Sequence, residues 1–337
     1  MNDSNVTAYK LDSKTGALTL IAGSPCKGVD SPTSLAMSPD SHLLAVGNLN
    51  GSGISVFRMD LTNGSLTAVA GSPLPADSRG FPLQTAFHPS GKFLYMGMQT
   101  SSTSDVVAFS VDASAGTLTP LPGSPFHGQT LIGVGGVNSI ACDPKGKFVF
   151  ASGNFGGITS YSVDSSRGAL NELLSSPLPT PATSFNSKIT VDTVGKFLCV
   201  ADFDNDGVWV FPINADGSLK PAVAGSPFAS GVGPRDIALD PRGEFAFVPN
   251  EGDLNDAVLK VDPTTGARTL VDSADTGYGP SSVAVDSSEK YPYVTNYWDG
   301  TVSAYTIDAA SGALAAVAGS PFAAQDGPIS VVITKVR

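Results

Sequence analysis

The chain has 337 residues, of which 15% are charged, and it carries a formal net charge of −11 with only 19 Lys and Arg. This acidic balance argues against nucleic acid as a partner. The sequence contains no run of about 18 apolar residues, which is the length that a membrane-spanning helix needs. The 37 Gly and 25 Pro are spread along the chain and indicate many turns, not a linker or a disordered tail.

The cysteines and histidines are isolated from one another along the sequence. Three cysteines do not make a disulfide framework, and neither a CxxC pair nor a histidine cluster offers a zinc site. We therefore expect no metal and no cofactor. The residues concerned are Cys26, Cys142 and Cys199, and His42, His88 and His127.

One sixteen-residue pattern, clearest in VDASAGTLTPLPGSPF, recurs along the whole chain in seven copies. The turn glycines of successive copies lie 46 to 52 residues apart. A period near fifty with short β-type runs is typical of four-stranded propeller blades, whereas no window shows the apolar period of a helix. These glycines are Gly16, Gly64, Gly116, Gly168, Gly217, Gly266 and Gly312.

Each repeat unit predicts four strands, and the chain begins in the middle of a unit. A third strand is expected at 5–12 and a fourth strand at 18–23, and later examples lie at 106–112 and 117–123. First strands are predicted at 34–39, 84–89, 139–144, 188–193, 236–241, 282–287 and 330–335. Second strands are predicted at six places, 43–48, 93–98, 148–153, 197–202, 245–250 and 291–296.

These strands predict one all-β domain over residues 1–337, a seven-bladed β-propeller with four-stranded antiparallel blades. One blade is expected to be closed by strands from the amino and carboxy termini, which removes open sheet edges. No second strand is found for that blade. Either the natural sequence extends upstream of Met1, or this blade has only three strands.

The tetrapeptide GSPF and its variants are expected to mark the outer end of each blade. Glycine tolerates a turn and proline cannot extend a ladder, while the next apolar residue can pack between blades. The unit that ends in DSADTGYG is the one without this motif. The copies are GSPC at 23–26, GSPL at 71–74, SSPL at 175–178, and GSPF at 123–126, 225–228 and 319–322.

Two positions of the repeat carry a charge in only one copy. Arg235 is the one charged residue just before a first strand, and Glu251 is the one charged residue just after a second strand. Both lie in the unit without the GSP motif. They fit either an ion pair on the rim or a site, in which the arginine binds a carboxylate or an oxyanion and the glutamate acts as a base.

Two further motifs allow more than one interpretation. DFDNDG at 202–207 resembles the start of a calcium loop, but Ile213 stands where the loop needs an acid, so a tight turn is favoured. Tyr297 and Trp298 fit equally well an aromatic platform for a sugar ring and the cap of a hairpin.

The segment GPRDIALDPRGEFAFVPNE (233–251) resembles the GPRH…HP-G-YAY-NE signature of the seven-bladed lactonase family. That family includes bacterial 6-phosphogluconolactonase and the fungal carboxymuconate lactonizing enzyme, and the likeness of architecture covers essentially the whole chain. It implies a funnel site that uses Arg235 and Glu251. Ser187 stands where the family has a histidine and Tyr297 where it has a second arginine, while Asp202 belongs to an aspartate pair that the family also shows.

Two functions follow as hypotheses. The first is a lactonase-like hydrolase that opens a small, sugar-derived lactone with Arg235 and Glu251 as catalytic residues. The second is a non-catalytic propeller that serves as an extracellular or periplasmic binding scaffold. The composition slightly favours a secreted or periplasmic location over the cytoplasm. The expected substrate-binding residues are Gln99, Asn138, Asn154, Ser187, Asp202 and Tyr297.

Overall fold

The computed structural model describes residues 4–50, 53–75, 80–100, 104–128, 136–153, 157–178 and 188–334. Over these ranges the chain forms strands and turns without any helix, as the all-β prediction requires. The described part of the chain accordingly offers no helix with the length and hydrophobicity to cross a membrane.

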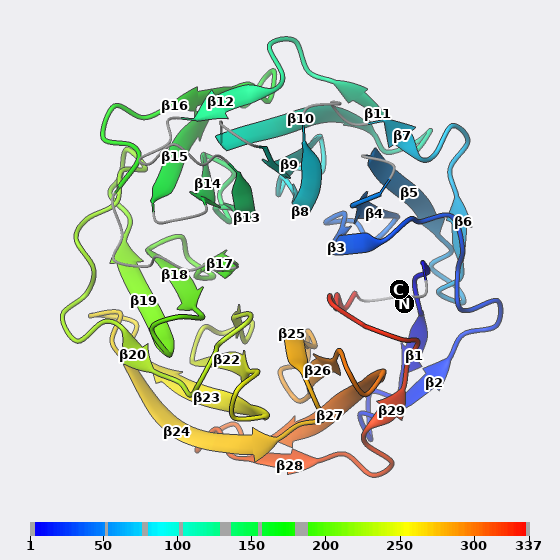
Figure 1. Cartoon of the computed structure of the whole chain (residues 1–337), viewed down its shortest axis with the longest axis vertical. Coiled ribbons are helices and arrows are strands. Elements are labelled where there is room, and N and C mark those ends of the chain that lie inside the picture. The colour runs from blue at the N-terminus through cyan, green and yellow to red at the C-terminus, as the bar shows by residue number, and fades with distance from the viewer. Residues whose placement is uncertain are drawn as a thin grey trace.

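The strands form antiparallel sheets around a central axis, with the first strand of each sheet innermost (Figure 1). Six sheets contain a path of four strands, which confirms a propeller with four-stranded antiparallel blades. The innermost strands are β3 (Pro32–Met37), β8 (Phe81–Phe87), β13 (Val137–Cys142), β17 (Lys188–Val191), β21 (Ala238–Leu239) and β25 (Pro280–Val285). The second strands are β4 (Leu43–Asn48), β9 (Phe93–Gln99), β14 (Phe148–Gly153), β18 (Phe197–Asp202), β22 (Phe245–Asn250) and β26 (Pro292–Asn296).

The outer half of each blade is formed by a third strand and a short outermost strand. The third strands are β5 (Gly53–Met59), β10 (Ser104–Asp112), β15 (Ile158–Val163), β19 (Gly207–Pro212), β23 (Asn255–Val261) and β27 (Thr301–Ile307). The outermost strands are β6 (Leu66–Ala68), β11 (Thr117–Pro120), β16 (Leu170–Glu172), β24 (Arg268–Asp275) and β28 (Leu314–Ala316). In the remaining blade a single bridge, Ile213–Leu219, marks this place, and the fourth strand of the sheet is β20 (Phe228–Ala229), which pairs with the start of β19.

The second strands lie almost where the sequence predicts them. Every residue of β4, β18 and β22 is buried, because both faces of each strand pack against neighbouring blades. A strand buried on both faces reads as a continuous apolar run, and a turn bounds each run. These two signals fix both ends of the strand in the sequence.

All six first strands end earlier than predicted, and four of them also begin earlier, whereas β17 begins at the predicted residue and β21 begins two residues later. At their end, the polar residue that was counted in the strand belongs to the following turn: Asp143 Oδ1 accepts the N–H of Phe148 at 2.9 Å, and Asp240 Oδ1 accepts that of Phe245 at 2.8 Å. A seventh first strand was predicted at 330–335, and its described residues, 330–334, are not assigned to any strand. We find no second strand beside them in the described ranges with which they could pair.

The GSP motif has the structural role predicted from its repetition. In each of its six copies the serine hydroxyl accepts the N–H of a third-strand residue sixteen positions earlier, as in Ser124 to Ala108 at 3.0 Å. The Ser-Pro bond is cis in all six. The residue after the proline then pairs with the start of the third strand, in β7 (Leu74–Pro75), β12 (Phe126–Gly128), β20 and β29 (Phe322–Ala323), and as a single bridge at Cys26 and Leu178.

Between the β25–β28 blade and the β3–β6 blade lies a smaller sheet of two strands, β1 (Tyr9–Leu11) and β2 (Leu18–Leu20). The carboxy-terminal segment runs inward from β29 and passes close to this sheet (Figure 1). By repeat position β1 corresponds to a third strand and residues 330–334 to a first strand. The ring therefore holds six complete blades and one place with fewer strands.

Candidate functional site

The position just before each predicted first strand lies inside the observed strand in four of the blades, where it forms a β-bulge. The pairing register shifts at Thr33, Leu83, Asn138 and Ser281, so each of these residues lacks a partner on the second strand. A bulge turns its side chain away from the regular alternation of the strand. Thr33 and Ser281 use this freedom to donate to carbonyl groups of the next blade, Pro82 at 3.0 Å and Pro328 at 2.8 Å.

Arg235 occupies the same place in the β21–β24 blade. It lies between the Pro234–Asn250 bridge and the Ala238–Phe247 pair of β21 and β22. Its side chain contacts Glu251 of its own blade: the Nε and Nη2 atoms both reach Glu251 Oε2. Each side chain is 28% exposed, so both remain accessible to a small molecule.

Glu251 is held in place by a backbone contact that the blades share. Its N–H donates to Gly233 O at 2.9 Å, as the N–H of Tyr297 donates to Gly279 O at 2.7 Å in the next blade. These bonds join the loop before the first strand to the end of the second strand. The two predicted catalytic residues are thus brought together at one end of one blade.

Phe203, from the preceding blade, completes the wall around Arg235. The guanidinium carbon lies 4.2 Å from the centre of the Phe203 ring, which is a cation–π contact. Asp206 of the same turn accepts the N–H of Gly233 at 3.0 Å. The planar guanidinium therefore has a carboxylate on one side and an aromatic face on another.

The other predicted site residues occupy different settings. Gln99 ends β9, Asn138 is a buried bulge residue of β13, and Tyr297 follows β26 and meets the Trp298 ring edge-on with 4.7 Å between centroids. Because they hold equivalent places in the blades, they lie on the same end of the ring as Arg235. Asn154 and Ser187 are outside the described residues.

Asp202 is fully buried, and its partners belong to its own hairpin. Its carboxylate accepts from Asn205 Nδ2 at 2.7 Å, from Trp209 Nε1 at 2.9 Å and from the N–H of Asp204 at 3.2 Å. Asn296 ends its second strand in the same way and bonds its own hairpin at Thr301 and Ser303, each at 2.9 Å. Asp202 thus fixes the turn that carries Phe203.

The sequence comparison missed three polar residues that stand at the first position of predicted innermost strands. Lys188 Nζ donates to Gln84 Oε1 although β13 lies between their strands in the ring, so the contact reaches across the inner side of β13 (Figure 1). Burial lowers the pKa of Lys188, and the charge of Asp236 opposes this shift. Four of the seven copies have serine at this first position of the predicted strand. The departure of Gln84, Lys188 and Asp236 from serine is the signal by which the sequence could have identified them.

The sequence comparison also missed Asp256, which lies in the same blade as Arg235. The other six copies carry Val or Ile at this place of the third strand, and those residues are buried. Asp256 is fully buried as well, and neither carboxylate oxygen makes a hydrogen bond among the described residues. Burial raises its pKa well above the usual value, and the nearby charge of Asp236 adds to the shift.

The arrangement around Arg235 can bind and polarise a carbonyl or carboxylate group. A guanidinium presents forked donors, and a partly exposed carboxylate beside it can orient water. Within the described residues, no three metal-ligating side chains gather into a metal site. A cavity of about 1140 Å³ lies elsewhere, between β1 and the carboxy-terminal segment, and neither Arg235 nor Glu251 lines it.

Comparison with known proteins agrees with this architecture. The periplasmic gluconolactonase of Pseudomonas aeruginosa superposes with a TM-score of 0.78 at 20% identity, over 97% of this chain and 96% of that one. The 6-phosphogluconolactonase of Yersinia pestis is 28% identical over 198 residues, which are 56% of this chain and 53% of the relative. That of Yersinia enterocolitica is 29% identical over 179 residues, 51% of this chain and 47% of the relative. The chain thus matches about half the length of these curated relatives.

Fold and site together define a β-propeller with an arginine–glutamate pair at one end of its ring. The family model "Lactonase, 7-bladed beta-propeller" matches residues 2–79 and 82–328. The chain belongs to this lactonase family, as the resemblance of residues 233–251 predicted.

Proposed function

We propose that the protein hydrolyses a small, sugar-derived lactone beside Arg235 and Glu251. The observation that carries this proposal is their contact. They are the single charged residues at two matching positions of the repeat, and they meet, partly exposed, in a chain of the lactonase family. The relatives named 6-phosphogluconolactonase and gluconolactonase support a sugar lactone as the substrate class.

The chemistry needs a base and an oxyanion donor. Glu251 accepts a proton from a water molecule as the water oxygen attacks the carbonyl carbon of the lactone. Negative charge develops on the carbonyl oxygen, and Arg235 donates hydrogen bonds to it. The ring C–O bond then breaks, and Glu251 returns the proton to the leaving alkoxide, which gives the hydroxy acid. The lactone and the water would bind at Arg235 Nη1 and Glu251 Oε1, the atoms that lie outside the contact between the two side chains, while the Phe203 ring keeps the guanidinium in place.

The surrounding residues are proposed to select the substrate. Asn138, Asn154, Ser187, Gln99 and Tyr297 would supply hydrogen bonds to sugar hydroxyls, and Asp202 would act indirectly through the turn that holds Phe203. Lys188 follows Ser187 directly, on the innermost strand β17 of the preceding blade. It would give a second cation for a substrate that carries a carboxylate or phosphate.

We also propose that the ring is a single seven-bladed domain over residues 1–337. The two-stranded sheet β1–β2 and residues 330–334 occupy the places of a third, a fourth and a first strand. They would form a seventh blade closed by both ends of the chain. The name of the matching family supports this blade count.

The test is hydrolysis of gluconolactone and 6-phosphogluconolactone by the purified protein, corrected for spontaneous hydrolysis. We expect turnover by the wild type and a loss of about 10² to 10³ in kcat for Arg235→Ser and Glu251→Gln. Arg242→Ser is the matched control, because Arg242 lies in a turn of the same blade and pairs with Glu289 at 2.7 Å. Absence of turnover by the wild type would contradict the proposed lactone hydrolysis. An equal loss of kcat in the control would contradict the assignment of Arg235 and Glu251 as catalytic residues.

A further inference from the structure

Two exposed aromatic side chains lie together on the loops of the β25–β28 blade. Trp298 is 63% exposed and Tyr278 is 57% exposed, and Phe81 is the one other exposed aromatic side chain in the described ranges. The N–H of Trp298 donates to Tyr278 O at 3.0 Å, so the two side chains leave the backbone at neighbouring points. The Tyr297 ring meets the indole edge-on. We call Tyr278, Tyr297 and Trp298 the aromatic platform.

The neighbouring β21–β24 blade builds the same loop without aromatic residues. Val232 and Gly252 stand there at the places of Tyr278 and Trp298. The N–H of Gly252 donates to Val232 O at 2.9 Å, which repeats the bond between the two aromatic residues. Valine and glycine are therefore sufficient for this loop. The aromatic side chains add an exposed apolar surface that the fold does not require, and such a surface is typical of a binding site.

The indole of Trp298 is held against the backbone of its own blade. A Cβ atom on Gly279 would overlap Trp298 Cδ1, so the ring occupies the space that a side chain at this position would need. Gly279 also has a φ of 76°, a conformation that glycine adopts without strain. The ring thus packs on the main chain on one side and is open to solvent elsewhere. A ring fixed in this way loses little conformational entropy when a ligand stacks on it.

The platform adjoins the pair of Arg235 and Glu251 around the ring. Glu251 follows β22 just as Tyr297 follows β26, so both residues lie at the same end of the ring. The two blades pack through a shared core that contains Phe247 and Val283. Packed sheets lie roughly 10 Å apart, a separation that matches the span of two linked sugar rings. One ligand can therefore reach both the pair and the platform.

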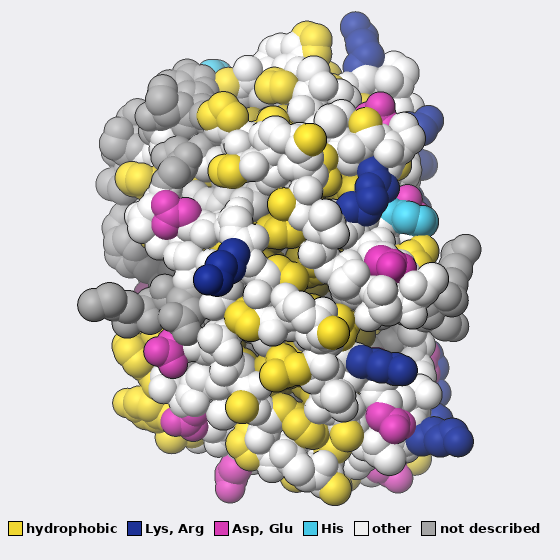
Figure 2. All heavy atoms as spheres, turned by 90° about the vertical axis from the view of Figure 1, so that its right-hand side faces the viewer, with side chains coloured by type: hydrophobic (Ala, Val, Ile, Leu, Met, Phe, Trp, Pro, Cys, Tyr) yellow, Lys and Arg dark blue, Asp and Glu magenta, His cyan; other side chains and the backbone are white. Residues whose placement is uncertain are grey.

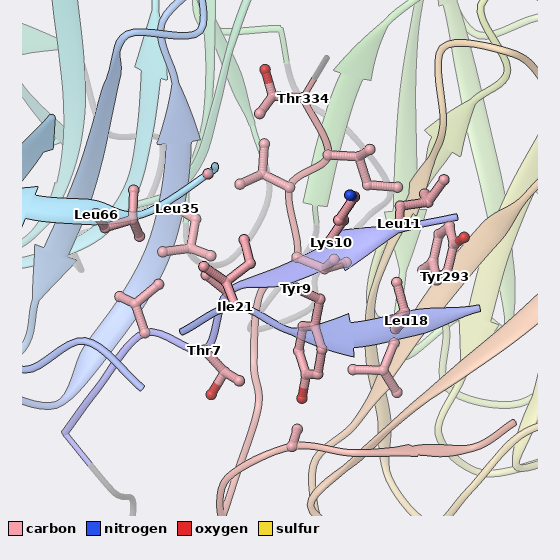
Figure 3. Close-up of a pocket in the computed structure, with 18 of the residues that line it drawn as sticks. Thr7, Tyr9, Lys10, Leu11, Leu18, Ile21, Leu35, Leu66, Tyr293 and Thr334 are labelled. Carbon is pink, nitrogen blue, oxygen red and sulfur yellow. The ribbon is translucent and has the colours of Figure 1, made fainter. Parts of the chain in front are cut away.

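Other apolar surfaces of the ring are arranged differently. Figure 2, which faces the edge of the ring at β2 and β6, shows hydrophobic side chains dispersed between scattered charged ones, as is normal for a protein surface. The cavity between β1 and the carboxy-terminal segment has apolar lining residues such as Leu18 and Leu35 (Figure 3), but neither Tyr278 nor Trp298 lines it. The platform is thus a separate surface on which large aromatic side chains are both grouped and open to solvent.

The chemistry of the platform suits a neutral sugar ring. A pyranose has an apolar face of C–H groups, which stacks on an aromatic ring, and hydroxyl groups around its edge. The Tyr278 hydroxyl and the Trp298 indole N–H provide hydrogen-bonding groups beside the aromatic faces. The carboxylate of Asp299, which accepts the N–H of Tyr278 at 2.6 Å, disfavours a phosphate or carboxylate at this place and can accept from a sugar hydroxyl.

We propose that the aromatic platform binds the second sugar ring of a glycosylated aldonolactone, whose lactone ring is opened beside Arg235 and Glu251. This inference rests on the proposed lactone hydrolysis and specifies its substrate class as a lactone that carries a neutral glycosyl group. The reaction itself is the same: water adds to the lactone carbonyl, the ring C–O bond breaks, and the glycosidic bond stays intact. The platform contributes binding and specificity, not chemistry.

The test compares hydrolysis of cellobionolactone and of gluconolactone by the wild type and by Trp298→Ala. We expect the ratio of the two kcat/KM values, cellobionolactone over gluconolactone, to fall about tenfold in the variant and mainly through KM, because one stacked aromatic contact is lost. Trp298→Phe keeps an aromatic face and should retain most of this ratio. Phe81→Ala removes an exposed aromatic ring from another blade, and as the matched control it should leave the ratio unchanged.

The outcomes distinguish the platform from the proposed hydrolysis. An unchanged ratio in Trp298→Ala, with gluconolactone still hydrolysed by the wild type, would overturn the platform and leave the hydrolysis standing. A Trp298→Ala chain that melts at a lower temperature and loses both activities by the same factor would identify the indole as the cap of its hairpin instead.

A binding measurement tests the platform without turnover. Calorimetric titration of the wild type with cellobionate and with gluconate should show tighter binding of cellobionate, and Trp298→Ala should abolish this difference. If the wild type hydrolyses neither lactone but shows this difference, the platform stands as a sugar-binding site and the proposed hydrolysis fails. Equal affinity of the wild type for cellobionate and gluconate would overturn the platform.

Discussion

The β21–β24 blade and the β25–β28 blade stand side by side with the same backbone and different chemistry. Both join the loop before the first strand to the end of the second by the same main-chain bond, 2.9 Å at Glu251 and 2.7 Å at Tyr297. Five of the differences in sequence place a charged side chain in the β21–β24 blade where the β25–β28 blade has an uncharged one. The pairs are Arg235 and Ser281, Asp236 and Ser282, Glu251 and Tyr297, Asp256 and Val302, and Arg268 and Leu314.

The difference separates what the fold requires from what one blade adds. Serine, tyrosine, valine and leucine are sufficient to build the β25–β28 blade, so the charges of the β21–β24 blade are not needed for the architecture. Two of them, Arg235 and Glu251, are partly exposed and available for chemistry. Asp256 and Arg268 are buried, at 0% and 5% exposure, and they should lower stability, because a buried charge is costly unless it is fully paired.

The largest effect is expected at Asp256. The Asp256→Val variant takes the residue of the next blade, and it should raise the free energy of unfolding at pH 7 by about 2 to 4 kcal/mol. The carboxyl has a raised pKa in the folded state. The contribution of the protonated carboxyl to the free energy of unfolding is therefore complete below pH 4. This contribution falls by about 1.4 kcal/mol per pH unit as the pH rises toward the folded pKa. Urea unfolding between pH 4 and pH 8 should show this slope in the wild type only.

The neighbouring blade provides the reverse exchange as a control. Val302→Asp should introduce a similar loss of stability with rising pH, because Val302 is 6% exposed at the equivalent place. The charge of Asp236 adds to the raised pKa of Asp256 and the backbone of Val248 opposes it, while the charge of Asp256 in turn contributes to the raised pKa of Tyr305. If Asp256→Val destabilised the protein, or if the wild type showed no pH dependence in this range, the carboxyl would have a partner in solution.

How much of this comparison was readable from the sequence depends on the position. Arg235 and Glu251 were found because each repeat unit serves as a reference for the others. Asp256 was missed although it differs from the repeat just as clearly, because the other six copies carry Val or Ile at its place. The contact between Lys188 and Gln84 could not be read, since it joins blades that are not neighbours and depends on how the ring closes.

The fold shows the same division between local and distant causes. Second strands such as β4 were predicted to the residue, because burial on both faces and a turn at each end are local signals. Residues 330–334 were wrongly predicted as a strand, because their local pattern matches a first strand while the partner that would pair with them is not supplied by the described chain.

A smaller effect, on activity, is expected for Arg235→Lys. The ammonium keeps the charge but lacks the forked donors and the flat face that stacks on Phe203. We expect kcat/KM for the lactone to fall by about 10 to 100-fold, which corresponds to about 1.4 to 2.7 kcal/mol. Ser281→Lys in the next blade is the control and should leave turnover unchanged. Full activity of Arg235→Lys would show that only the charge matters at this place.

The smallest effect is expected at Arg268, which stands where the other six copies have leucine. Its Nη1 donates to Gly266 O at 2.7 Å and its Nη2 lies 3.1 Å from Cys199 Sγ, but its buried Nε has no partner among the described residues. An unpaired buried donor costs free energy that leucine does not incur, so Arg268→Leu should raise the free energy of unfolding by about 1 kcal/mol. Leu314→Arg should lower the free energy of unfolding by more, because Leu314 packs against an apolar cluster that contains Phe247. A loss of stability in Arg268→Leu that also appears in Cys199→Ala would instead show that the contact between the guanidinium and the thiol stabilises the blade.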